Sequence, residues 1–217
     1  ISGGTENHCM LIDLRNKKKP FLLFFFGILG GTFDPPHAGH VAAAVAAWRQ
    51  LGLDEVKVIP AGLAPLRAVP PLASSAHRLA MAKLAFAPCT WARVDDREVR
   101  RTGVCWSVDT ARDLAAEFPE SRRVWIIGAD QLARLDRWKE IDTLGRLVEF
   151  AVLSRDGLPV AAPATIAGFI RLTVLKESPV RVSSTALRAA LATGEPAGNG
   201  LPNAVRAYIE EHTLYKS

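Results

Sequence analysis

The sequence contains little cysteine, tyrosine or methionine, with three Cys, two Tyr and two Met in 217 residues. The cysteines, Cys9, Cys89 and Cys105, lack the spacing of a zinc site, and their odd number does not suggest a disulfide framework. Reduced thiols in a cytoplasmic protein are the interpretation that this pattern favours.

A strong excess of charge and a long apolar run are also missing. The formal net charge is +5, without a clustered basic face that carries interleaved aromatic residues, so we expect no nucleic-acid partner. The run "FLLFFFGIL" at residues 21–29 is too short to cross a bilayer as a helix, so we expect no membrane anchor. The basic stretch before it is similar to a signal peptide, but no small-residue cleavage site follows. We therefore expect residues 1–20 to be a poorly ordered or non-native leader and residues 21–217 to form one domain.

Short apolar runs alternate with segments of helical character along the rest of the chain. Strands are predicted at residues 24–29, 56–59, 91–94, 124–127, 150–153 and 170–174, and helices at 41–51, 74–86, 108–118, 141–147, 184–191 and 204–212. This alternation predicts an α/β fold, a Rossmann-like doubly wound parallel sheet with helices on both faces. Ligands of such sheets bind beyond the carboxyl ends of the strands, which points to residues 30–40, 60–67, 128–130, 154–157 and 181–188.

The stretch "GGTFDPPHAGH" at residues 30–40 follows the first predicted strand. Gly30 and Gly31 have no side chains, so a phosphate can approach the backbone there, close to the positive end of the following helix. His37 and His40 are three residues apart, so both can face one side of the first helical turn and hold phosphate oxygens. A turn with two surface histidines is the alternative, and a zinc site is disfavoured because no further ligand lies at a suitable spacing.

This stretch resembles the H-x-G-H signature of a nucleotidyltransferase superfamily, and "GGTFDPPH" is similar to its bacterial nicotinate-nucleotide adenylyltransferase family. The resemblance implies adenylyl transfer from ATP to nicotinate mononucleotide, giving nicotinate adenine dinucleotide and pyrophosphate for NAD biosynthesis. It implies that His40 stabilises charge on the α-phosphate, that no covalent intermediate forms, and that Mg²⁺ arrives on ATP without a resident metal. The implied ATP contacts at this end are Gly30, Gly31, Thr32, Phe33, His37 and His40.

A second motif of the superfamily has the form I-S-S-T-x-x-R, and "VSSTALR" occupies residues 182–188. Ser183 or Ser184 can cap a helix here, while Thr185 adds a hydroxyl and Arg188 projects one turn along. The free amides and the guanidinium suit the β- and γ-phosphates of ATP, so Arg188 joins His37 and His40 as a candidate catalytic residue. An ordinary capped helix with a solvated arginine remains the alternative.

Further stretches extend the resemblance over residues 28–215. "IIGADQLARLDRWKEIDTL" at 126–144 supplies Asp130 for a ribose and Trp138 for stacking on a pyridine ring, with core packing as the alternative for Trp138. "CWSVDTARDL" at 105–114 has Trp106 and Ser107 where the family has Tyr and Thr. The implied nicotinate mononucleotide contacts are Arg67, Trp106, Ser107, Thr110, Asp130, Trp138 and Arg155.

One departure lies in "APLR" at residues 64–67, where Leu66 and Arg67 replace a histidine and a lysine of the family. The positive charge survives at Arg67, whereas any role of the loop histidine is lost. A site that selects nicotinate should also offer amide or hydroxyl donors and no nearby acid. Two alternatives stay open: a related H-x-G-H transferase that uses nicotinamide mononucleotide, phosphopantetheine or a cytidylyl group, and a nucleotide-binding module without turnover.

Overall fold

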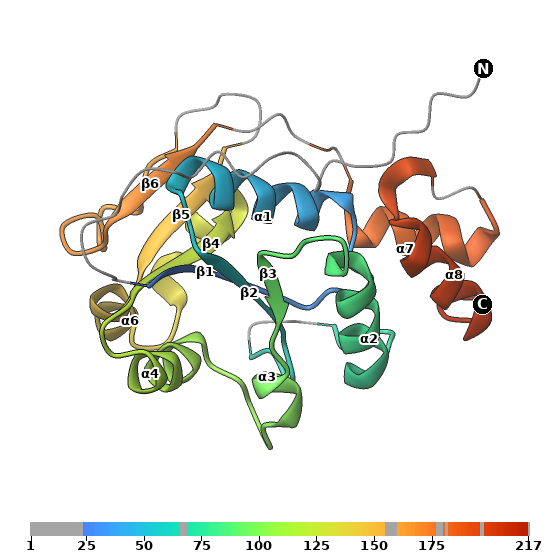
Figure 1. Ribbon diagram of the computed structural model, residues 1–217, viewed down its shortest axis with the longest axis horizontal. Helices are drawn as coiled ribbons and strands as arrows, with labels where there is room; N and C mark the ends of the chain where they lie inside the picture. Colours follow the sequence, from blue (N-terminus) through green and yellow to red (C-terminus); the bar gives the residue numbers. More distant parts are fainter. Residues whose placement is uncertain are drawn as a thin grey trace.

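The computed structural model describes residues 24–65, 69–154, 160–176, 180, 182–195 and 198–216, so the predicted leader lies outside the described residues. The described strands form one sheet in the order β3-β2-β1-β4-β5-β6, in which every neighbouring pair is parallel (Figure 1). The strands are β1 (Phe25–Gly31), β2 (Glu55–Pro60), β3 (Ala92–Val94), β4 (Arg122–Gly128), β5 (Glu149–Leu153) and β6 (Leu172–Leu175).

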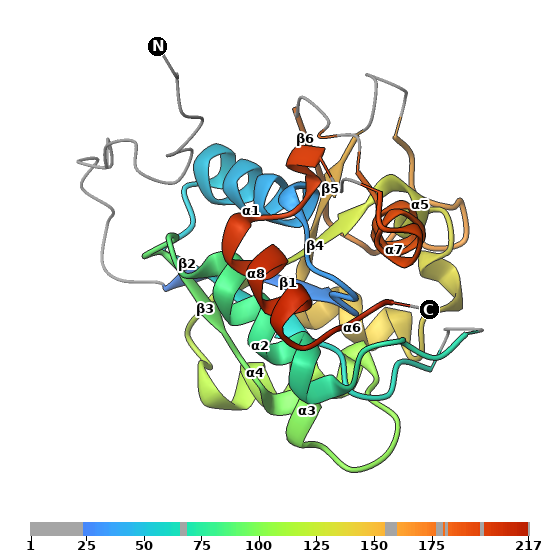
Figure 2. The ribbon, with the colours of Figure 1, turned by 90° about the vertical axis from the view of Figure 1, so that its right-hand side faces the viewer.

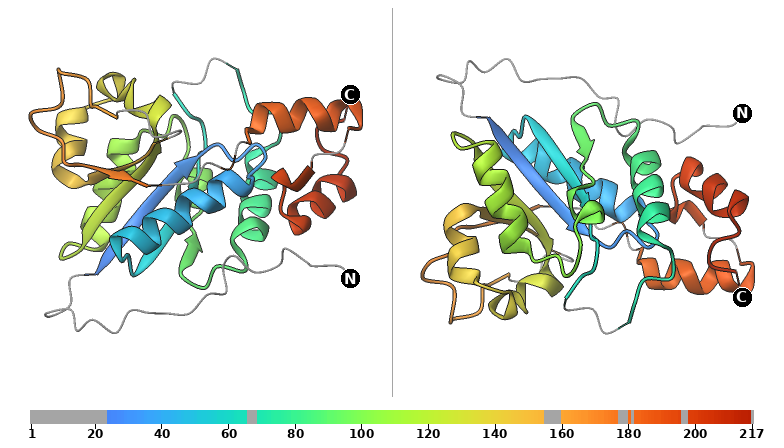
Figure 3. Two further views of the ribbon diagram at one scale, coloured as in Figure 1. Left: turned by 90° about the horizontal axis from the view of Figure 1, so that it is seen from above. Right: turned by 90° about the horizontal axis from the view of Figure 1, so that it is seen from below.

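Six of the described α-helices lie between strands in the chain order and two follow β6, and helices cover both faces of the sheet. They are α1 (Ala38–Leu51), α2 (Ser75–Phe86), α3 (Arg97–Arg100), α4 (Ser107–Glu117), α5 (Ala129–Leu132), α6 (Ile141–Leu147), α7 (Ser184–Thr193) and α8 (Asn203–Glu211), with 3₁₀ turns η1 (Leu135–Arg137) and η2 (Gly198–Gly200). Figure 3 shows α1 across one face and α4 with α6 across the other. Helices α7 and α8 both lie at one end of the molecule (Figure 1), where α8 packs beside α2 (Figure 2).

Alternating side chains of the central strands enter two separate cores. Ile126 of β4 packs with Ala44, Ala47 and Met81 of α1 and α2 on one face. Trp125, its neighbour in the strand, packs with the core of α4 and α6 on the other face. A strand buried on both faces has no polar side to alternate with, which explains why these strands appear in the sequence as continuous apolar runs.

Strand order reverses between β1 and β4, because β2 and β3 lie on one side of β1 whereas β4, β5 and β6 lie on the other. A crevice forms at the carboxyl ends of the strands at such a reversal. The predicted doubly wound parallel fold is confirmed. The last strand begins two residues later than the predicted 170–174, because the backbone N–H of Ile170 bonds to the carbonyl of Ile166 in a preceding turn.

The described ranges contain no helix with both the length and the apolar character needed to cross a membrane. Cys89 and Cys105 are both buried.

Candidate active site

A cavity of about 550 Å³ opens at the carboxyl ends of the central strands, where the strand order reverses. Segments far apart in the sequence line it: the end of β1, the start of α1, the loop after β2, the start of α4, the end of β4 and the start of α7. The predicted site residues in the lining are Gly30, Gly31, Thr32, His37, His40, Trp106, Ser107, Asp130, Trp138, Ser183 and Ser184.

His40 is held in one orientation by the helix that carries it. The backbone N–H of His37, the N-cap residue of α1, donates to Nδ1 of His40 over 3.1 Å. The two imidazole rings stack with their centroids 3.7 Å apart, and Phe33 meets the ring of His40 edge-on at 4.9 Å. Because Nδ1 accepts a hydrogen bond, a neutral His40 carries its proton on Nε2.

Burial, followed by the charge of the neighbouring His37, holds the pKa of His40 well below its usual value. His40 is therefore neutral near pH 7, and it offers the cavity an N–H donor of fixed direction rather than a mobile cation. Such a donor suits a phosphate whose charge grows during a reaction.

The glycines of this stretch leave room for aromatic rings. A β-carbon on Gly39 would lie 3.0 Å from the His37 ring, and one on Gly31 would lie 3.3 Å from the Phe33 ring. Phe33 itself is buried and adopts a positive φ of 51°, so it supports His40 from behind and does not line the cavity. Its predicted contact with ATP stays a prediction.

Asp34 fastens the loop between Gly31 and His37. Its carboxylate is 1% exposed and accepts hydrogen bonds from the N–H groups of Leu72 (2.9 Å) and Ala73 (3.0 Å) and from the hydroxyl of Tyr215 (2.8 Å). Burial and this hydrogen bond raise the pKa of Tyr215, so the hydroxyl keeps its proton. The histidine-bearing loop is thus connected to the loop after β2 and to the end of the chain.

The start of α7 is fastened to the same loop. Ser183 caps the helix by accepting from the N–H of Ala186, and the Ser184 hydroxyl donates to the carbonyl of Pro35 over 2.9 Å. Arg188 Nη1 donates to the carbonyl of Asp34 over 2.7 Å, and its Nη2 donates to the Thr185 hydroxyl over 3.3 Å. Thr185 and Arg188 lie beside the cavity and not in its lining.

The opposite wall of the cavity is aromatic. Trp125 and Trp138 meet edge-on at 6.1 Å, and Trp106 is the N-cap residue of α4. The side chain of Trp106 makes no capping hydrogen bond to α4, and Ser107, the first residue of this helix, lines the cavity. Asp130 also lines this wall, and its Oδ1 lies so close to Gly128 that a β-carbon there would be 2.5 Å away.

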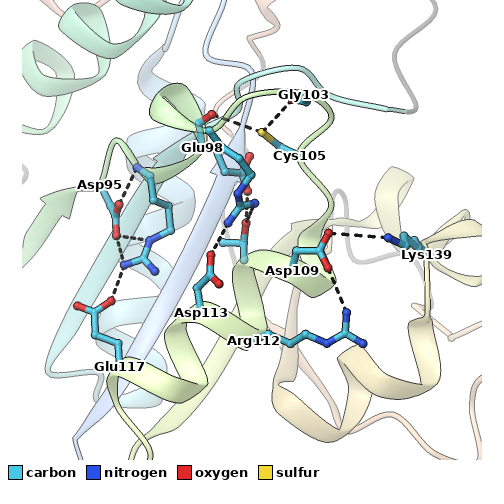
Figure 4. Close-up of polar contacts among 12 residues, drawn as sticks. Asp95, Glu98, Gly103, Cys105, Asp109, Arg112, Asp113, Glu117 and Lys139 are labelled. Carbon is cyan, nitrogen blue, oxygen red and sulfur yellow. Dashed lines mark hydrogen bonds and ion pairs between the residues drawn. The ribbon is translucent and has the colours of Figure 1, made fainter.

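Thr110 does not reach the cavity. It is fully buried, its hydroxyl donates to Glu98 Oε1 over 2.7 Å, and it accepts from Arg101 over 3.1 Å. Glu98 and Cys105 line the cavity instead, and Figure 4 shows the Cys105 thiol directed at the Glu98 carbonyl. Burial raises the pKa of Glu98 and so favours its neutral form. The expectation that no acid lies near the carboxylate of nicotinate stays a prediction.

Comparison with known proteins gives the family. Residues 28–190 match the family model described as cytidylyltransferase-like. A "probable nicotinate-nucleotide adenylyltransferase" of Chromobacterium violaceum is 41% identical over 209 residues, covering 88% of this chain and 98% of that protein. The chain belongs to the nicotinate-nucleotide adenylyltransferase family. A second "probable nicotinate-nucleotide adenylyltransferase", from Roseiflexus sp., is 42% identical over 194 residues. The match covers 88% of this chain and 97% of that protein.

Solved structures support the fold of this family. Plasmodium falciparum nicotinic acid mononucleotide adenylyltransferase, complexed with NaAD, superposes with a TM-score of 0.70 at 16% identity, covering 88% of this chain and 97% of that one. The same protein complexed with APC gives the same TM-score. The family resemblance indicated by the motifs is confirmed.

Arg78 organises the site, although sequence patterns did not single it out. It is 2% exposed, and its Nη1 donates to the carbonyls of Thr32 and Ala61, both over 2.7 Å. Its Nε donates to the carbonyl of Ala73 over 3.3 Å, and its Nη2 donates to that of Gly62 over 3.4 Å. One buried cation thus joins the loops after β1 and β2. The signal in the sequence that could have indicated this role is the position of Arg78 among the apolar residues on the buried face of α2.

Two predicted contacts, Arg67 and Arg155, lie outside the described residues, as does Leu66. In the ranges that the structure covers, no group of three or more His, Cys, Asp or Glu is arranged to hold a metal ion.

Proposed function

We propose that this chain transfers the adenylyl group of ATP to nicotinate mononucleotide, releasing nicotinate adenine dinucleotide and pyrophosphate. The observation that carries the proposal is the place of His40 beside His37 on a cavity that also contains the tryptophan wall. The backbone N–H of His37 donates to Nδ1 of His40, which leaves Nε2 as the donor of a neutral ring. A phosphate site and an aromatic site share one cavity, as a reaction that joins two nucleotides requires.

In the proposed reaction, an oxygen of the mononucleotide 5′-phosphate attacks the α-phosphorus of ATP. The bond from that phosphorus to the oxygen bridging the β-phosphate breaks, and the electron pair leaves with pyrophosphate. Charge grows on the α-phosphate oxygens, where the Nε2–H of His40 stabilises it. Alignment and charge stabilisation are sufficient, so the chain needs no nucleophile of its own.

The β- and γ-phosphates are assigned to the start of α7. Ser183 and Ser184, at the start of this helix, line the cavity, and the N–H groups of a first helical turn suit phosphate oxygens. Arg188 uses two of its N–H donors on Asp34 and Thr185, and a guanidinium has five in all, so donors remain for a phosphate oxygen. We propose that ATP enters as its Mg²⁺ complex, because Mg²⁺ keeps several waters and needs few protein ligands.

The tryptophan wall is assigned to the mononucleotide. Trp138 offers a flat surface for the pyridine ring, and Asp130 offers carboxylate oxygens to ribose hydroxyls. The uncapped N–H groups at the start of α4 suit the carboxylate of nicotinate. The buried free thiol of Cys105 favours a reducing compartment, so we place the protein in the cytoplasm.

Pyrophosphate release tests this proposal directly. The protein is incubated with Mg-ATP and, in separate reactions, nicotinate mononucleotide, nicotinamide mononucleotide or phosphopantetheine. Fastest release with nicotinate mononucleotide is expected. Fastest release with another acceptor would favour a related transferase, and ATP binding without release under any condition would favour a binding module.

A further inference from the structure

Lys139 is a charged residue on the aromatic wall, and it has no role in the reaction proposed above. It follows Trp138 in the sequence, and it lines the cavity together with Trp106 and Ser107. Its Nζ lies 5.3 Å from the centroid of the Trp106 ring. The ammonium is therefore close to the uncapped start of α4, where Trp106 is the N-cap residue.

The acids around Lys139 are engaged by another cation. Asp109 and Glu140 lie 3.8 Å and 3.9 Å from Nζ, beyond hydrogen-bond distance. The guanidinium of Arg112 forms ion pairs with both carboxylates. It donates to Asp109 over 3.1 Å and lies closer still to Glu140. Figure 4 shows Asp109 between Arg112 and Lys139. Within the described ranges Nζ donates no hydrogen bond to the protein, so its donors remain available to a ligand.

Lys139 also differs in charge from the other lining residues. The described lining contains two carboxylic acids, Glu98 and Asp130, and Lys139 is its one lysine or arginine. A carboxylate that enters between the start of α4 and Trp138 would meet this ammonium. A carboxamide of the same shape would gain little, because it carries no net charge.

We propose that Lys139 is a specificity-determining residue, which favours the acid form of the pyridine mononucleotide over the amide form through the charge of its ammonium. This inference rests on the proposed function. The side chain is 41% exposed, and a cation in partly wet surroundings at such a distance changes the affinity for an anion by about three- to tenfold. Backbone N–H groups supply the remaining preference.

The test compares kcat/KM for nicotinate and nicotinamide mononucleotides at saturating Mg-ATP. Lys139→Met removes the charge and keeps the length of the side chain, whereas Lys139→Arg keeps the charge. Lys83→Met is the matched control, since Lys83 is an exposed lysine of α2 outside the cavity lining. We expect Lys139→Met to lower kcat/KM for the acid by about three- to tenfold and to leave the amide within twofold. Lys139→Arg and Lys83→Met should keep the wild-type ratio.

Equal losses for the two substrates would place the ammonium at the phosphate that they share, or give it a structural role, and would overturn the proposal. An unchanged ratio in Lys139→Met would overturn it as well. A wild-type protein that releases pyrophosphate with neither mononucleotide would refute the proposed function instead, so the two failures can be told apart.

Discussion

Replacing Arg78 by Met should weaken both the fold and the nucleotide site. The change removes the guanidinium that donates to the carbonyls of Thr32 and Ala61, and it leaves these buried acceptors without that donor. A hydrogen bond to a charged group contributes about 1.5–3 kcal/mol, so the two 2.7 Å bonds contribute roughly 3–6 kcal/mol together. Part of this loss is offset because a buried cation no longer has to be desolvated.

We therefore expect the free energy of unfolding to fall by about 2–4 kcal/mol and Tm to fall by roughly 4–16 °C for a chain of this size. Well below Tm, kcat/KM for ATP should fall by about ten- to hundredfold, because the loop that carries Thr32 and the histidines loses its alignment. Arg78→Lys keeps the charge but not the geometry of the guanidinium, so it should lie between wild type and Met.

Urea unfolding and steady-state kinetics measure these effects. Arg93→Met is the control, because Arg93 is a mostly exposed arginine of β3 whose contact with Glu55 is 3.8 Å long. Its free energy of unfolding should change by about 0.5 kcal/mol or less. Wild-type stability in Arg78→Met, or an equal loss in Arg93→Met, would refute the role assigned to Arg78.

Two further predictions concern the phosphate side of the cavity. Arg188→Ala should weaken ATP binding, as measured by calorimetry. Arg188→Lys should keep only part of the wild-type affinity, because an ammonium cannot make a bidentate contact. Unchanged ATP affinity in Arg188→Ala would exclude a contact between Arg188 and the triphosphate. Because the pKa of His40 is lowered in the folded state, the unfolded chain binds this proton more tightly, and stability should fall as pH drops below about 6.5. Removing the imidazole in His40→Gln should reduce that part of the acid destabilisation, as followed by urea unfolding at pH 5 to 8. An identical pH dependence in wild type and His40→Gln would show that the pKa of His40 is not lowered.

The sheet was predictable from the sequence because its strands are buried on both faces, so each is an apolar run of strand length. The first and last residues of the strands were less well predicted. The backbone ladder continues through Gly30 and Gly31 of β1 and through Arg122 and Arg123 of β4, which have no apolar side chain to mark them. Helices α3 and α5 have four residues each, too few to show a helical period.

The glycines and histidines after β1 and the serines at the start of α7 all line the cavity, and they were predictable as site residues because each group lies in a local motif. Arg78 was not, because its 2.7 Å bond to Thr32 joins residues 46 positions apart and depends on how α2 packs. Thr110 lies in a motif that indicated substrate contact, but the helix turns its hydroxyl inward to Glu98. Glu98 and Lys139 precede and follow α4 in the sequence, and both line the cavity because of how the segments beside α4 fold. No local sequence pattern specifies that arrangement.

The central claim is that His40 stabilises the transition state of adenylyl transfer as a neutral donor. Measuring kcat with Mg-ATP and nicotinate mononucleotide in wild type and His40→Ala, together with the Kd of ATP, tests it most directly. The account predicts that kcat falls by about 10²–10³ while the Kd of ATP changes far less, as when one donor to a developing negative charge is removed. A variant with near wild-type kcat, or one whose loss lies entirely in the Kd of ATP, would contradict it.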